Sequence, residues 1–160
     1  MRHLLLLSCS ATKRPDPGLL PARDRYDGPV YRVVRANRAG LDLAIWIVSA
    51  EFGFISEEHP LPLYDRRMTK ARARELENGV SAALDELLHQ ERFASLFINL
   101  GKDYAFTLCS SVLLPQMRAD NLVTEAHGGI GLRLRQTKLW LLSRVAIPSG
   151  LSSSQRGSFD

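Results

Sequence analysis

Three short, uninterrupted apolar runs constrain the fold of this chain more than any other feature. They cover residues 3–9, 43–50 and 95–101 and read HLLLLSC, LAIWIVSA and SLFINLG. Runs without polar alternation are typical of strands that are buried on both faces, which is the situation in a parallel sheet. A weaker run, NLVTEA at 121–126, is expected to add a fourth strand.

Helical patterns fill the segments between these runs, at 28–41, 68–92, 103–117 and 129–145. The clearest is 68–92, in which Thr69 is a suitable N-cap and apolar residues recur at helical spacing: Leu76, Val80, Ala83, Leu84, Leu87 and Leu88. The others are expected to turn these residues inward: Val30, Val33, Val34 and Asn37 in the first helix, and Leu132, Leu139, Trp140 and Leu142 in the last. The alternation predicts a single α/β domain over 1–147, with three layers and a mostly parallel central sheet. The Ser- and Gly-rich residues 148–160 are predicted to be a disordered tail.

Composition narrows the class of protein without fixing its function. The chain has 160 residues, of which 45% are hydrophobic and 24% charged, as in ordinary globular domains. Its net charge is +4 and arginine far outnumbers lysine, which is compatible with nucleic-acid binding and equally with a solvated basic surface. Two distant cysteines and four scattered histidines form no metal-binding pattern, so no metal or other cofactor is expected. No run approaches the roughly 18 apolar residues of a membrane span, and the expected location is the cytoplasm. The oligomeric state stays open.

Polar residues follow each of the three strong strands. The first ends in Ser8, Cys9 and Ser10 with Lys13 and Arg14 close behind, the second in Ser49 and Glu51, and the third in Asn99, Lys102 and Tyr104. Ligands of open parallel sheets bind outside the carboxyl ends of the strands. These residues are therefore expected to share one binding rim.

Two loops are expected to reach the same rim. One holds Arg23, Asp24, Arg25 and Tyr26, and the other holds Tyr64, Asp65, Arg66 and Arg67. Each combines a carboxylate, an aromatic ring and two cations, which suits a reaction centre, base stacking and phosphate binding. The alternative is structural: Asp24 pairs with a neighbouring arginine, and Asp65 lies in a turn.

Individual residues leave similar alternatives. Cys9 fits a small packing residue better than a nucleophile. Asn99 needs hydrogen-bond partners if it is buried, and Glu51 is either a general base or the partner of an arginine. The GGIG stretch at 128–131 can expose backbone N–H groups to an anion at a helix start. The nucleotide-binding patterns GxxxxGK[ST] and GxGxxG and the hydrolase pattern GxSxG are missing from the sequence.

Several motifs together resemble an uncharacterised bacterial and phage domain family. They are LLSCSATK, ARDRYDGPVYR, WIVSAEFGFIS, PLYDRRMT, NLGKDY and GGIGLRLRQTKLW, and they span about residues 4–142. That family is similar to the peroxide-stress protein family YaaA. It also resembles a phage-defence DNA glycosylase that removes glucosylated hydroxymethylcytosine. The resemblance implies a base-flipping enzyme that hydrolyses an N-glycosidic bond in DNA.

Such an enzyme needs a carboxylate beside the sugar, a group that reads the base, aromatic rings and cations for phosphates. The catalytic candidates are Asp24 or Asp65 as the carboxylate, with Glu51 as the third choice, and Asn99 as the residue that reads the base. Base or substrate contacts are expected from Ser8, Cys9, Ser10, Tyr26, Ser49, Tyr64 and Tyr104. DNA phosphates are expected to bind Lys13, Arg14, Arg23, Arg66, Lys102 and Arg133. Lys102 is alternatively a Schiff-base lysine. The other functions left open are a non-catalytic DNA-binding stress protein and an enzyme of free nucleotides or nucleosides.

Overall fold

A five-stranded sheet forms the centre of the computed structural model, which describes residues 1–145. Its order is β4-β3-β1-β6-β7, with β1 at His3–Ser8, β3 at Leu43–Ser49, β4 at Gly53–Ser56, β6 at Ser95–Asn99 and β7 at Val123–Glu125. β1, β3, β6 and β7 run parallel, and β4 turns back antiparallel to β3. The prediction of a single α/β domain with a mostly parallel sheet is confirmed. The expected tail at 148–160 lies outside the described residues.

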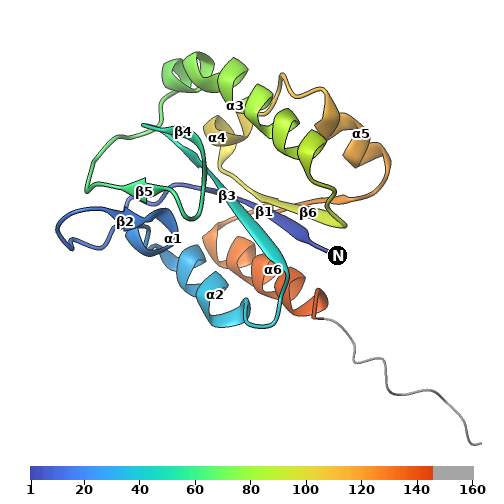
Figure 1. Ribbon diagram of the computed structural model, residues 1–160, viewed down its shortest axis with the longest axis horizontal. Helices are drawn as coiled ribbons and strands as arrows, with labels where there is room; N and C mark the ends of the chain where they lie inside the picture. The colour runs from blue at the N-terminus through green and yellow to red at the C-terminus, as the bar shows by residue number, and fades with distance from the viewer. Residues whose placement is uncertain (146–160) are drawn as a thin grey trace, which may run out of the picture.

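Helices cover both faces of the sheet (Figure 1). α2 (Pro29–Asn37) and α6 (Ile130–Ser143) lie on one face, and α3 (Lys70–Gln90), α4 (Lys102–Phe106) and α5 (Leu113–Ala119) lie on the other. Alternate β1 residues feed the two cores: Leu4 and Leu6 pack toward α3, while Leu5 and Leu7 pack toward α2 and α6. All four are fully buried, which explains why the sequence of this strand lacks polar alternation.

A small layer lies at the carboxyl edge of the sheet. It consists of α1 (Ala22–Arg25) and the two short antiparallel strands β2 (Leu20–Pro21) and β5 (Pro60–Leu61). In Figure 1 the parallel strands run from the side marked N toward this layer. One of the polar loops predicted from the sequence contains α1, and the other follows β5 directly. The small layer therefore positions the side chains of both loops at the strand ends.

Arg25 holds this layer together. Its side chain is fully buried and donates hydrogen bonds to the carbonyl oxygens of Arg14, Asp16, Gly18 and Leu61, at 2.6–3.4 Å. A buried guanidinium is stabilised when several acceptors surround it. The sequence pattern had grouped Arg25 with the cations of a binding loop, and the structure shows instead a structural residue that ties the 14–18 segment to β5.

Two helix predictions were wrong. The 103–117 segment forms two short helices rather than one, because Asp85 on α3 accepts hydrogen bonds from the Val112 and Leu113 amides and so caps a new helix start. In α6 three of the four residues expected to face inward, Leu132, Leu139 and Leu142, are about half exposed. The fourth, Trp140, is buried as predicted, and Thr137 and Leu141 are buried beside it. The inward stripe was hidden because one of its members, Thr137, is polar.

The remaining helix predictions hold. Thr69 caps α3 through a 3.1 Å hydrogen bond from the Arg72 amide to its hydroxyl oxygen. Val80 and Leu84, on the inward face of α3, are buried as predicted. In α2, Val34 is buried together with Tyr31, which the predicted stripe had not included. Among the described residues, no helix is long and apolar enough to cross a membrane.

Candidate functional site at the carboxyl edge of the sheet

Three tyrosines from three different segments converge on the ends of β1 and β3. We call Tyr26, Tyr64 and Tyr104, together with Cys9, Ser49 and Lys13, the tyrosine cluster. The hydroxyl groups of Tyr26 and Tyr64 are hydrogen-bonded to each other, and Tyr64 Oη lies 3.0 Å from Ser49 Oγ. Tyr104 Oη lies 3.2 Å from Cys9 Sγ. The cluster therefore links the small layer to two central strands and to α4.

The parallel register explains this convergence. Ser8 pairs with Val48, so Cys9 and Ser49 follow at the same level of neighbouring strands. The 9–13 segment then continues to an isolated bridge between Lys13 and Tyr26, which brings the lysine back over the rings. Lys13 Nζ lies 4.6 Å from the centre of the Tyr64 ring and 5.9 Å from that of Tyr26, in cation–π geometry. Lys13 forms no ion pair within the described part of the chain.

Burial keeps the phenols of the cluster protonated. It raises the pKa of Tyr64 to about 12, although hydrogen bonds with Ser49 and Tyr26 act in the opposite direction. Burial also raises the pKa of Tyr26, helped by its hydrogen bond with Tyr64, and that of Tyr104, helped by Cys9. At neutral pH these hydroxyl groups therefore remain neutral hydrogen-bond donors and acceptors rather than bases.

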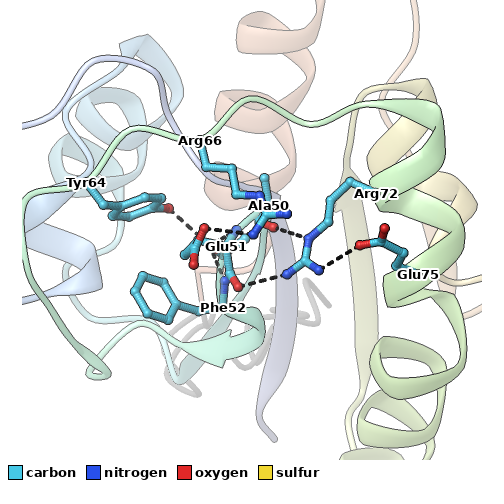
Figure 2. Close-up of polar contacts among 8 residues, drawn as sticks. Ala50, Glu51, Phe52, Tyr64, Arg66, Arg72 and Glu75 are labelled. Carbon is cyan, nitrogen blue, oxygen red and sulfur yellow. Dashed lines mark hydrogen bonds and ion pairs between the residues drawn. The ribbon is translucent and has the colours of Figure 1, made fainter.

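The β3–β4 turn carries a carboxylate and an exposed aromatic ring beside the cluster (Figure 2). Ser49 Oγ accepts hydrogen bonds from the amides of Glu51 (3.3 Å) and Phe52 (3.1 Å), so the hydroxyl group that contacts Tyr64 also shapes this turn. The Phe52 ring is 39% exposed and lies 5.1 Å from the Tyr64 ring in edge-on geometry. Sequence reasoning missed Phe52 because the motif SAEFG drew attention to its polar residues.

Two arginines fix this turn. Arg66 donates to Glu51 Oε2 at 3.0 Å, which matches the alternative that Glu51 is the partner of an arginine. Arg72 donates to the carbonyl oxygens of Ala50 (2.8 Å) and Glu51 (3.0 Å) and to the Glu75 carboxylate (3.0 Å). Figure 2 shows Arg66 and Arg72 approaching the turn from the loop and from α3. Arg72 had not been predicted, because it is one of many arginines on an amphipathic helix.

A second feature of the rim is a cavity of about 220 Å³ between the first turns of α2 and α6, which we call the strand-end cavity. It is lined by Ser8, Pro29, Val30, Asn99, Ile130, Arg133 and Leu134. Both helices begin at a glycine N-cap without a side-chain cap, Gly28 and Gly129. The first-turn N–H groups of α6 and the Arg133 side chain make this end of the sheet favourable for anions. α2 contributes less, because Pro29 has no N–H and the Tyr31 and Arg32 amides already donate to the Gly28 carbonyl oxygen.

Asn99 has a defined orientation in this cavity. Arg133, which can only donate, lies 3.3 Å from Asn99 Oδ1 through Nη1. The Thr137 hydroxyl donates to the Arg133 carbonyl oxygen at 2.8 Å, so its oxygen accepts the 3.2 Å hydrogen bond from Asn99 Nδ2. Within residues 1–145, one N–H and one lone pair of the amide therefore have no partner and can serve a ligand. The expected partners of a buried amide are confirmed, and the partner residues Arg133 and Thr137 both come from α6.

Gly28 packs closely against the residue that follows the first strand end. A Cβ atom at this position would collide with the Ser10 hydroxyl oxygen. Ser10 therefore packs on the start of α2, while Ser8 is held by its carbonyl oxygen, which accepts a 2.7 Å hydrogen bond from Tyr31. Cys9 lies between them, half buried and in contact with both hydrophobic cores, as expected for a packing residue.

The structure does not bring all predicted site residues into this arrangement. Asp24 and Asp65 make no hydrogen bond or ion pair within residues 1–145 that would join them to the tyrosine cluster. Arg14 pairs with Asp16 at 2.8 Å, and Arg23 lies 3.7 Å from Glu57 and 3.6 Å from Glu58, so their charges are already compensated. Lys102 is exposed at the start of α4, and within the described residues no His, Cys, Asp and Glu side chains form a metal-binding group.

Comparison with known proteins identifies the family to which this chain belongs. The model of a family of unknown function (DUF6884) matches residues 4–138, and the chain belongs to this family. No curated protein and no solved structure matches it.

Proposed function

We propose that this protein is an N-glycosidase that flips a modified base out of DNA and releases it at the carboxyl edge of the sheet. The observation that carries the proposal is the convergence of the tyrosine cluster, Glu51 and the strand-end cavity on neighbouring strand ends. Neutral donors, a cation, a carboxylate and an oriented amide are the groups that base release requires.

The reaction breaks the bond between the sugar C1′ and the base nitrogen. The bonding electrons leave with the base, and the oxygen of a water molecule bonds to C1′ while its proton is passed to the departing base. Positive charge develops on the sugar before water adds, and a carboxylate beside it stabilises that charge. Glu51 is the carboxylate best placed for this, because its own backbone amide is held by Ser49, the residue that contacts Tyr64.

The departing base carries the opposite charge. The phenols of the tyrosine cluster are poor acids but good neutral hydrogen-bond donors, and Lys13 places an ammonium group over two of the rings. Preorganised donors and a cation lower the free energy of a transition state in which negative charge forms on a leaving group. Phe52 offers an exposed ring on which a flipped base can stack.

Base recognition falls to Asn99 in this proposal. Its free N–H and lone pair present an adjacent donor and acceptor, which can pair with one edge of a nucleobase. Arg133 and the first turn of α6 line the same cavity, and they would hold a phosphate group there.

A second candidate is a nucleic-acid-binding protein without catalysis. The Arg66–Glu51 ion pair favours it, because this arginine compensates the charge of the carboxylate that catalysis would need. In an enzyme, substrate binding has to separate or reorient this pair.

A base-release assay tests the proposal. The protein is incubated with unmodified DNA and with phage DNA that carries hydroxymethylated or glucosylated cytosines, and released bases are identified by mass spectrometry. The proposal predicts base release from a modified DNA, abasic sites in equal number, and loss of at least about 100-fold in rate for Glu51→Gln. DNA binding that remains unchanged in Glu51→Gln, with no base released by the wild type, would establish the second candidate instead.

A further inference from the structure

A second cavity, of about 170 Å³, lies between α3 and α4 on the other face of the sheet from the strand-end cavity. We call it the α3–α4 cleft. It is lined by Lys70, Ala73, Arg74, Lys102, Asp103 and Phe106. α4 lies between this cleft and the tyrosine cluster. Lys102 and Phe106 of this helix line the cleft, whereas Tyr104 of the same helix contacts Cys9 in the cluster.

The cations of the cleft are uncompensated. Lys70, Arg74 and Lys102 are exposed, and none of them forms an ion pair with a carboxylate of residues 1–145. One carboxylate, Asp103, also lines the cleft, so three positive charges face a single negative one. Cations that line one cleft without ion-pair partners create a positive potential there, which attracts an anionic ligand.

Some other surface arginines of the molecule differ in this respect. At the opposite, amino edge of the sheet, Arg2 pairs with Asp42 and Glu91, and Arg38 pairs with Glu57. The charges at that edge are therefore balanced locally. The cleft therefore differs from the amino edge, because its three cations have no ion-pair partner within residues 1–145.

The floor of the cleft is apolar. Ala73 is buried, and the Phe106 ring is 38% exposed at its side. An aromatic ring beside several cations is the combination with which proteins bind an unpaired nucleotide, since the base stacks on the ring and the phosphates meet the cations. A simple anion site has no need for the ring.

We propose that the α3–α4 cleft is a second nucleotide subsite. In it, the base of a nucleotide next to the excised one stacks on Phe106, and its phosphates bind Lys70, Arg74 and Lys102. This proposal rests on the proposed function for the position of that nucleotide, but binding in the cleft can be measured without base release. The strand then passes over α4 between the cleft and the tyrosine cluster.

Two triple variants test it. Lys70→Gln, Arg74→Gln and Lys102→Gln together remove the charges of the cleft. The matched control, Arg92→Gln, Arg135→Gln and Lys138→Gln, removes three exposed cations that do not line the cleft and that form no ion pair in the described chain. Binding of a labelled single-stranded oligonucleotide is measured by fluorescence anisotropy over a series of salt concentrations. Binding of thymidine 3′,5′-bisphosphate, a single nucleotide with phosphate on both sides, is measured by calorimetry.

The cleft variant should bind the oligonucleotide at least about tenfold more weakly, and the slope of log K against log salt should become shallower by about 0.7 for each phosphate group that the cleft no longer binds. It should also fail to bind the bisphosphate, whereas the control binds both ligands as the wild type does. Phe106→Leu should weaken binding and leave the salt slope unchanged, because it removes stacking and no charge.

Equal affinities and equal slopes in the two triple variants would overturn the subsite, whatever the result of the base-release assay. Absence of base release together with a cleft-dependent salt slope would overturn the glycosidase and leave the subsite standing. If the wild type binds neither the oligonucleotide nor the bisphosphate, the subsite fails, and the base-release assay alone decides the glycosidase.

Discussion

Replacement of Arg25 by methionine should destabilise the protein by about 2–4 kcal/mol. The guanidinium makes its two shortest hydrogen bonds to the carbonyl oxygens of Arg14 (2.6 Å) and Gly18 (2.7 Å), and its charge is fully buried. A hydrogen bond from a charged group contributes about 1.5–3 kcal/mol. Two such bonds give an upper value near 6 kcal/mol, and water that enters the exposed 14–18 segment recovers part of it.

Urea unfolding followed by circular dichroism measures this change, and thermal unfolding should show a midpoint lower by about 4–16 °C. Arg23→Met is the matched control, since Arg23 belongs to the same short helix but is only partly buried and forms only long ion pairs, 3.7 Å to Glu57 and 3.6 Å to Glu58. It should cost less than about 1 kcal/mol. If both variants lose the same small amount of stability, Arg25 does not hold the small layer together, and the prediction is refuted.

Three further predictions concern the strand ends. Gly28→Ala should destabilise the protein by about 1–3 kcal/mol, because the new methyl group meets the Ser10 hydroxyl. In urea unfolding, the double variant Gly28→Ala with Ser10→Gly should regain most of the lost stability, and no regain would contradict the contact. Because the folded-state pKa of Tyr64 is raised above the ordinary value near 10, the stabilisation from its neutral phenol should be fully present below pH 10 and be lost as pH rises toward 12. In denaturation measured over a pH series, Tyr64→Phe should reduce this alkaline loss of stability. An unchanged pH profile would count against the buried phenol. Thr137→Val should lower the free energy of unfolding by about 1–2 kcal/mol, and it should also slow base release because the Asn99 amide is no longer held in place. Thr137→Ser keeps the hydroxyl group and should retain activity. Equal activity of the two variants would show that the orientation of Asn99 is unimportant.

The sequence determined the central layers well because burial on both faces leaves a direct mark on it. The apolar runs at 3–9, 43–50 and 95–101 coincide with β1, β3 and β6, and their polar ends do meet at one edge. Where a polar residue is buried for a tertiary reason, the pattern misleads. Thr137 faces Asn99 instead of solvent, so the inward face of α6 was placed on the wrong leucines.

The candidate site was predictable in its location but not in its contacts. Parallel register brings Cys9 and Ser49 to the same level, and this follows from topology alone. The convergence of Tyr26 and Tyr64 depends on the fold of the small layer, in which Arg25 binds carbonyl oxygens that no sequence motif identifies. The pairing of Glu51 with Arg66 likewise depends on how two separate loops approach each other in the folded chain.

The most direct test of the account uses DNA that contains a pyrrolidine in place of one sugar, because its positive charge mimics the charge that develops at C1′. This DNA should bind at least about 100-fold more tightly than DNA with a neutral abasic analogue. Hydrogen exchange should then show protection at residues 8–13, 49–53 and 99–104, the strand ends that form the rim. Equal affinity for the two analogues, or protection confined to the amino edge of the sheet, would contradict the assignment of the carboxyl edge as the site of base release.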